Sequence, residues 1–298
     1  MKTKTSYEDK VLQEINVWEQ EKPGSFFKAI DILGAPIRLM ASSVPEEIKR
    51  SVGAAIMGFM EMLKDLSFWT FSDRNILNEA RKAGITVDRV SDLANHDLEK
   101  LDKIARSYFS SNKLIAALEG AGCGLGGLAL IAADIPVLLG ISFRSIQQIG
   151  SAYGFNMQDP DMAPVIMSVF YAGTGVTVAV KSSVMADMHI AAAALAREMT
   201  YKEIAEKTKT GVIVDLLSKS SHALPKQIAE NITKRKLSQF IPIVGAAIGA
   251  GFNYWFMGNI VISAQMIFRK LYLERKHPTD AEKSSGRLKL FFSKPRMQ

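Results

Sequence analysis

The sequence predicts an all-α protein, a helical bundle with glycine-rich central helices. Apolar residues recur at helical spacing along most of the chain, and capping motifs and glycines mark helix ends. Two long segments are rich in glycine and mainly apolar. Residues 85–91 have a strand-like local pattern, but one short segment cannot form a sheet, so we interpret them as a connector.

The first element is an amphipathic helix that starts at Ser6-Tyr7-Glu8-Asp9, a capping motif, and ends before Pro23-Gly24. Tyr7, Val11, Ile15 and Trp18 form its apolar face. Because its polar face contains more acidic than basic residues, we expect it to dock on the body of the protein and not on a membrane.

Other helix starts are predicted at Ser43-Val44-Pro45-Glu46 and at Ser72-Asp73, the latter helix ending at Gly84. A charged helix is expected around residues 92–109, and further helices over 184–210 and 212–238. The inward positions of the charged helix are Leu93, Leu98, Leu101, Ile104 and Ala105.

Residues 119–154 form the central glycine-rich stretch, with glycines at 120, 122, 124, 126 and 127. Asp134-Ile135-Pro136 resembles a helix start in which Asp134 is the N-cap. The pattern therefore predicts a close-packing helix, a capped corner and a second helix that ends at Tyr153-Gly154.

A second apolar stretch covers residues 239–268. It contains no charged residue and is long enough to span a bilayer. Its Gly245 and Gly249 have the spacing by which membrane helices pack closely, but the same spacing serves buried helices. We favour the buried core of a soluble or peripheral protein. The alternative is an integral membrane protein with glycine-rich helical hairpins, and re-entrant insertion of residues 120–142 and 239–268 lies between the two.

Charge is concentrated at the C-terminus. Residues 269–298 contain nine Lys or Arg and three acidic residues, so they carry +6 of the net +7. Such a tail attracts an anionic membrane surface, or it only solubilises the chain. Nucleic-acid binding is disfavoured because the tail has few aromatic residues beyond Phe291-Phe292.

The N-terminus has no apolar signal segment, which predicts a cytoplasmic protein, peripheral at the inner membrane or, in the alternative, integral to it.

No recognisable cofactor or metal site is found. The sole cysteine, Cys123, excludes an internal disulfide and cysteine-based zinc sites. Gly122-x-Gly124-x-x-Gly127 matches the dinucleotide fingerprint, but a predicted helix precedes it and no acidic residue follows at the required distance. The four histidines are scattered. We therefore predict no cofactor and no metal.

A few polar residues stand in apolar surroundings and form the candidate centre. They are Glu119, Asp134, Arg144, Lys181 and Asn253. A buried ion is costly unless it is paired, and the pairs Asp134–Arg144, Glu119–Arg144 and Asp134–Lys181 are all open. We favour a structural role for them over an enzyme that uses buried Glu119, Asp134 and Arg144.

Five pieces of the chain resemble the EcsC family of bacterial proteins. They are Leu101-Asp102-Lys103-Ile104-Ala105, Glu119-Gly120-Ala121-Gly122, Asp134-Ile135-Pro136, Tyr153-Gly154-Phe155, and Pro242-x-Val244-Gly245-Ala246-Ala247-x-Gly249 followed by Asn253-Tyr254-Trp255.

The resemblance covers about residues 45–275. It implies an all-helical fold, no assigned activity, and a link to an ABC transporter and to secretion. We expect an N-terminal amphipathic arm over 1–40, an EcsC-like helical domain over 41–276, and a basic, disordered tail over 277–298. The expected function is that of a non-enzymatic protein, peripheral at the cytoplasmic face of the membrane, whose protein partner is a transporter by family association only.

Overall fold

The computed structural model describes residues 5–21, 46, 47, 50, 54, 57, 58, 72–125, 128–159, 162–174, 178–195 and 245–277. Side chains are described in these ranges except at 119–125, 128–135, 163, 164, 189–195, 245–250 and 252. The elements are α1 (Ser6–Gln20), α5 (Asp73–Lys82), the 3-10 helix η1 (Val90–Asn95), α6 (Leu98–Leu125), α7 (Leu128–Ala152), α8 (Ala163–Gly173), α9 (Val178–Leu195) and α13 (Gly245–Lys276). Within these ranges there is no strand, which confirms the all-α prediction.

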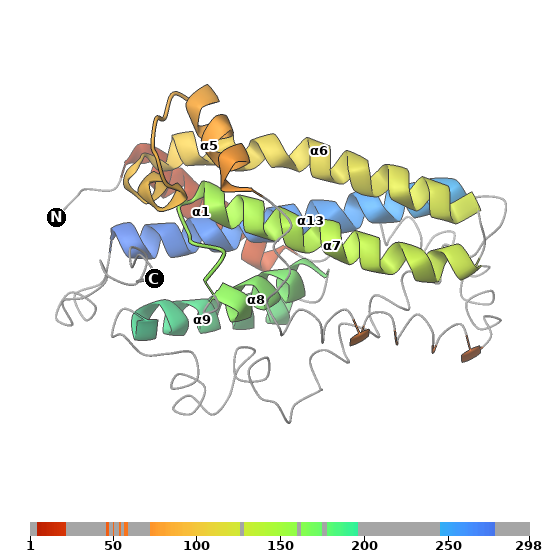
Figure 1. Cartoon of the computed structure of the whole chain (residues 1–298). Coiled ribbons are helices and arrows are strands. Elements are labelled where there is room, and N and C mark those ends of the chain that lie inside the picture. The colour runs from red at the N-terminus through yellow and green to blue at the C-terminus, as the bar shows by residue number, and fades with distance from the viewer. Residues whose placement is uncertain are drawn as a thin grey trace.

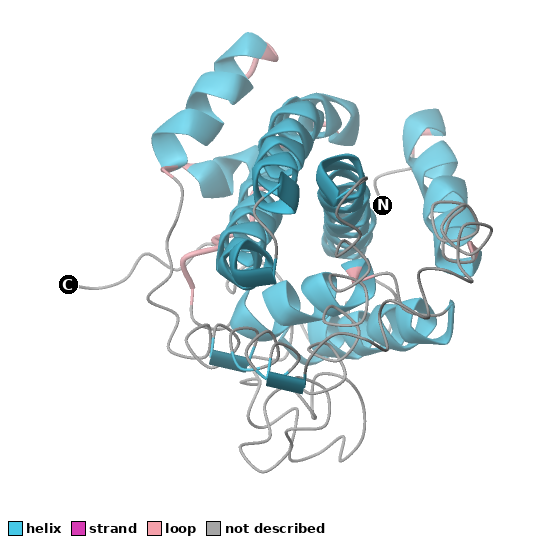
Figure 2. Ribbon diagram, turned by 90° about the vertical axis from the view of Figure 1, so that its right-hand side faces the viewer, coloured by secondary structure: helices cyan, strands magenta, loops and turns pink. Residues whose placement is uncertain are grey.

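The long helix α13 is the centre of the bundle, since it packs against α6, α7, α8, α9 and α1. It runs antiparallel to α6 and parallel to α7 (Figure 1). Viewed along the bundle, the shorter helices surround the long ones (Figure 2). The α6–α13 pair stays in contact over its length, from Lys113 beside Tyr254 to Asp102 beside Arg269. One end of the bundle therefore gathers the start of α6 and the ends of α7 and α13.

Aromatic side chains fill the space where α7, α8 and α13 meet. The rings of Phe143 and Phe170 stack with their centroids 4.7 Å apart, and Phe256 meets Phe170 edge-on at 6.2 Å. Such offset and edge-on pairs add to the hydrophobic gain from burying large rings. The helices around α13 are thus held by an apolar core.

Helix ends follow the sequence closely at several places. Thr5 caps α1 in a capping box with Glu8, one residue before the motif predicted it. Ser72 caps α5, as predicted. After α7, Gly154 has φ +78 and the amides of Gly154 and Phe155 donate to the carbonyls of Ser151 and Gly150, a Schellman motif. The predicted end at Tyr153-Gly154 is confirmed.

Gly84 closes α5 with the same geometry, since φ is +76 and the amides of Gly84 and Ile85 donate to Arg81 and Ala80. Residues 85–89 then connect to η1 without forming a strand, as predicted. The expected inward positions from Leu93 to Ala105 are all buried. The bounds of the charged helix predicted around 92–109 are wrong, however, because Leu93 lies in η1 and α6 begins only at Leu98 and continues to Leu125.

The predicted corner at Asp134 is wrong. The helix α7 begins six residues earlier, at Leu128, and Pro136 lies inside it. An interior proline costs about 3 kcal/mol, which the buried residues that follow, Leu138 and Leu139 among them, offset by packing. The described part of α6 ends at Leu125 and α7 begins at Leu128, so the Asp-x-Pro step lies within α7 and not at its start.

Some expectations fall on residues that the structure does not describe. They are the helix start at Ser43–Pro45, the part after Leu195 of the helix predicted over 184–210, the helix predicted over 212–238 and the tail after His277. The helix predicted over 184–210 begins six residues earlier, at Val178. None of the helices that are described is long and apolar enough to cross a bilayer.

Replacing each of the two left-handed glycines by alanine should separate backbone strain from packing. A Cβ at Gly84 meets nothing within 4 Å, so Gly84→Ala should cost only the left-handed conformation, about 1–2 kcal/mol. A Cβ at Gly154 would lie against the backbone of Ala94, so Gly154→Ala should cost roughly 3 kcal/mol or more. Urea unfolding measures both, and equal losses would contradict the close approach of Gly154 to Ala94.

Candidate functional site

Helix α1 lies across the end of the bundle where α6 begins and α13 ends. Its apolar face is buried, with Val11 1%, Ile15 2% and Trp18 6% exposed. It contacts α13, α9 and α6. The predicted docking of this amphipathic helix on the body is therefore confirmed.

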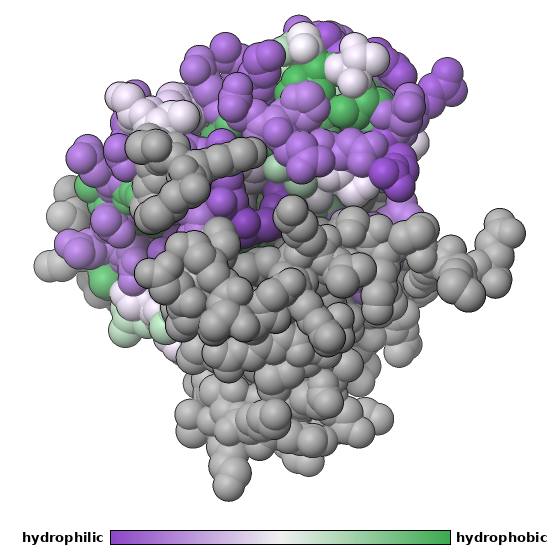
Figure 3. Space-filling model, turned by 90° about the vertical axis from the view of Figure 1, so that its left-hand side faces the viewer, coloured by the Kyte–Doolittle hydropathy of each residue, from purple (hydrophilic) through white to green (hydrophobic). Residues whose placement is uncertain are grey.

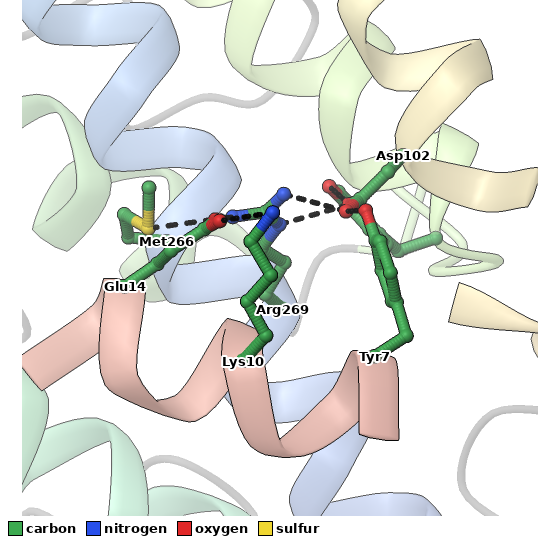
Figure 4. Close-up of polar contacts among 7 residues, drawn as sticks. Tyr7, Lys10, Glu14, Asp102, Met266 and Arg269 are labelled. Carbon is green, nitrogen blue, oxygen red and sulfur yellow. Dashed lines mark hydrogen bonds and ion pairs between the residues drawn. The ribbon is translucent and has the colours of Figure 1, made fainter. Parts of the chain in front are cut away.

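A carboxylate from α6 forms the centre of the polar contacts beneath α1. Asp102 is 1% exposed and accepts a hydrogen bond on each oxygen from a tyrosine. Tyr7 of α1 donates to Oδ2 and Tyr153, just after α7, donates to Oδ1, both at 2.5 Å. Figure 4 shows Tyr7 and Asp102 pointing toward each other from different helices. One carboxylate therefore connects three segments that are distant in sequence.

Arg269 of α13 completes the centre. It is fully buried and donates to Asp102 through both Nε (2.9 Å) and Nη2 (2.5 Å), in the paired geometry that suits a guanidinium and a carboxylate. Its Nη1 donates to Glu14 of α1 at 2.7 Å (Figure 4). We call Tyr7, Glu14, Asp102, Tyr153 and Arg269 the polar centre.

The pKa shifts in the polar centre favour one protonation state for each group. Burial alone lowers the pKa of Arg269, but its hydrogen bonds to Asp102 and the nearby negative groups outweigh this effect and raise it. Burial, followed by the hydrogen bond to Asp102, raises the pKa of Tyr7 to about 12. Burial also raises the pKa of Tyr153 well above its usual value. The raised pKa values keep Arg269 charged and the hydroxyls of Tyr7 and Tyr153 protonated near neutral pH, as donors to Asp102.

A second buried acid secures the start of α1. Glu8 is 1% exposed, accepts a hydrogen bond from the amide of Thr5, and pairs with Lys276 at 2.8 Å and with His277 at 3.2 Å. Burial alone raises the pKa of Glu8, but its bonds to Lys276, Thr5 and His277 outweigh that effect and lower it. Burial alone lowers the pKa of Lys276, but its hydrogen bond to Glu8 outweighs this effect and the pKa is raised.

The other end of α1 is capped by Lys181 of α9. Its ammonium donates to the carbonyls of Trp18 (2.9 Å) and Glu21 (3.0 Å) and lies 4.9 Å from the Trp18 ring centroid. A cation at the C-terminal carbonyls of a helix is favourable. Burial lowers the pKa of Lys181, opposed by the charge of Glu21.

The predicted candidate residues are not brought together among the described residues. Lys181 is buried as expected, but its partners are carbonyls of α1, and Asn253 is buried on α13. Arg144 is exposed on α7, so the expectation of a buried Arg144 is wrong. It faces outward because its neighbours in sequence, Phe143 and Ser145, take the inward positions. The side chains of Glu119 and Asp134 lie outside those that the structure describes.

Sequence reasoning missed Asp102 and Arg269, although a signal was present. Asp102 lies four residues after buried Leu98, and Arg269 three residues before buried Tyr272. Both therefore stand on the inward stripe of their helices. A charge at an inward position of an amphipathic helix is a better indicator of a buried pair than a charge between apolar neighbours. In the part of the chain that is described, no group of His, Cys, Asp and Glu could hold a metal.

Breaking the Asp102–Arg269 pair should strongly destabilise the protein. Asp102→Ala leaves the buried guanidinium without its main partner, which costs about 3–5 kcal/mol. Glu14→Ala removes a partner that is 34% exposed and should cost about 1 kcal/mol or less. Urea unfolding of the single variants and of Asp102→Leu/Arg269→Met tests this. The double variant removes the unpaired guanidinium and should be more stable than Asp102→Ala, but less stable than the wild type because the hydroxyls of Tyr7 and Tyr153 lose their acceptor. A double variant less stable than Asp102→Ala would contradict the buried-charge explanation.

The contribution of Glu8 should depend on pH. Because its folded pKa is lowered from the ordinary value of 4.5, its stabilising effect is full above pH 4.5 and is lost as the pH falls through the folded pKa. The stability difference between the wild type and Glu8→Gln should therefore shrink on acidification below pH 4.5. Denaturant unfolding at several pH values measures it, with Glu99→Gln, an exposed acid, as the control. A difference that grows on acidification would contradict the lowered pKa.

Comparison with known proteins finds relatives that match most of the chain. The model of the EcsC protein family matches residues 9–273, so the match begins within α1, earlier than the sequence motifs indicate. The chain is 24% identical over 274 residues to the uncharacterized protein YdbA of Bacillus subtilis (strain 168). This match covers 91% of this chain and 95% of that protein. It is 25% identical over 191 residues to Protein EcsC of the same organism, covering 64% of this chain and 72% of that protein. No solved structure matches. The chain belongs to the EcsC protein family.

Proposed function

We propose that this protein acts without catalysis, as a peripheral protein at the cytoplasmic face of the membrane, attracted there by its basic tail. The supporting observation is the distribution of charged and apolar groups along the bundle. The polar centre and the ion pair of Glu8 with Lys276 lie at one end. In the view onto this end the described residues are mainly hydrophilic (Figure 3).

Exposed large apolar side chains are concentrated away from that end. Of the seven such residues among the described ones, five lie on the opposite halves of α6, α7 and α13. These five are Leu114, Ile115, Leu118, Val137 and Tyr254. A soluble monomer rarely exposes a large apolar patch, so exposed apolar side chains that gather in one place favour a docking surface.

The polar centre supports the non-catalytic part of the proposal. Asp102 accepts bonds from Tyr7, Tyr153 and Arg269, so its oxygens are already occupied by protein donors. The enzyme alternative needs Arg144 to converge with Glu119 and Asp134 in a buried site, and an exposed Arg144 does not favour it. The link to transport or secretion, with a transporter as partner, rests on the family resemblance alone.

The full-length protein should co-sediment with vesicles that contain anionic lipid and much less with purely zwitterionic vesicles. Replacing Lys283, Arg287, Lys289, Lys294 and Arg296 by Gln should weaken the binding strongly, because each basic residue near an anionic surface contributes about 1 kcal/mol. Raised salt should weaken it in the same way.

The matched control neutralises five exposed basic residues at the hydrophilic end: Arg74, Lys82, Lys100, Lys103 and Arg106. This variant should retain most of its binding. Absence of vesicle binding by the wild type at low salt would rule out the proposed function.

A further inference from the structure

We propose that one face of the bundle, formed by Leu114, Ile115, Leu118 and Tyr254, enters the surface of an anionic bilayer. We call it the α6–α13 face. The inference rests on the proposed function and deepens it, since it names the surface that contacts lipid. A tail of basic residues can attract a membrane, but only apolar groups can use its acyl region.

The side chains of the α6–α13 face are unusually exposed for their type. Leu118 is 66%, Leu114 58%, Tyr254 51% and Ile115 46% exposed. Leu114 and Leu118 are one helical turn apart and so lie on the same side of α6. The adjacent Asn112 and Ala116 are buried, which fixes the direction in which this side of α6 points outward.

A basic and an aromatic residue border the face. The ammonium of Lys113 lies 5.0 Å from the centroid of the Tyr254 ring, so the pair connects α6 to α13 at this point. Tyrosine and lysine are suited to the boundary between headgroups and acyl chains, because each has an apolar body and a polar tip.

The charges on α6 match an anionic partner. Between Arg106 and Glu119 this helix contains one charged residue, Lys113, which is basic. The α13 segment 245–268 beside it contains no charge at all. Acidic lipid headgroups beside Leu114 and Tyr254 therefore meet a basic residue, Lys113.

The uncharged helix ends beyond the face fit the depth of an interface. The last six residues of α6, 120–125, and the first six of α7, 128–133, carry no charge. At 1.5 Å per residue each uncharged end is about 9 Å long. Interfacial helices bury about 5–10 Å into the boundary region, whereas crossing the hydrocarbon core takes about 30 Å. These lengths fit shallow contact and not spanning, and an anionic lipid surface is the occupant that Lys113 and the basic C-terminal residues complement.

Leu118→Glu tests the face, and Val17→Glu on α1 is its matched control. Val17 is 69% exposed, close to the 66% of Leu118, but it lies on the helix that covers the opposite end. With vesicles containing anionic lipid, Leu118→Glu should reduce the affinity by about tenfold or more, since burying one leucine side chain is worth a factor of this size. Val17→Glu should bind like the wild type. Both positions are exposed, and an unchanged unfolding midpoint verifies that each variant is folded.

An environment-sensitive fluorophore gives a second readout. It is attached at Leu118→Cys or at Val17→Cys, each in a chain with Cys123→Ser. Anionic vesicles should shift the emission to the blue at position 118 and leave it unchanged at position 17.

The outcomes separate the surface from the function. If wild type and Leu118→Glu bind vesicles equally and the label at 118 does not respond, the α6–α13 face is not the contact surface, although the proposed function stands. If the wild type binds no vesicles, the proposed function fails, and this inference with it. If the label at 118 responds to protein concentration without lipid and sedimentation shows a dimer, the face binds a second copy of the chain and the lipid assignment is overturned.

Discussion

The ion pair between Asp102 and Arg269 is the interaction on which the described architecture depends. Removing two charges from water is expensive, and their mutual attraction offsets that cost only if the remaining hydrogen-bonding capacity is also used. Tyr7 and Tyr153 supply the missing donors, and each comes from a different segment. The start of α6, the end of α7, the last turns of α13 and the helix α1 must therefore all be in place before the pair is satisfied.

This requirement explains why α1 belongs to the folded body. The apolar face of α1 alone would not fix the position of this helix along the bundle. Glu8 and Glu14, however, must reach Lys276 and Arg269. Lys181 then fixes its last turn. Together with the bond from Tyr7 to Asp102, these contacts at different points along one short helix define a single register. The family match that begins at residue 9 includes most of this helix.

The two ends of the bundle differ in what they leave for binding. At the polar end, charged groups are directed at one another. At the other end, helices are apolar in sequence and bear exposed residues such as Leu118. A bundle of this kind can be held rigid at one end while the other contacts a partner. Such a division fits the proposed function, in which the apolar end contacts a membrane surface.

The sequence by itself determined the local features. Helix periodicity, the Ser72 cap, the glycine ends at Gly84 and Gly154 and the uneven distribution of charge depend on neighbours within a few residues, and they could be predicted. Tertiary structure decided the rest. Pro136 lies inside a helix because packing offsets a local penalty, and Asp102 meets Arg269 across 167 residues because two inward stripes face each other. Which buried charges pair is a property of helix packing, and periodicity could only indicate that each of them points inward.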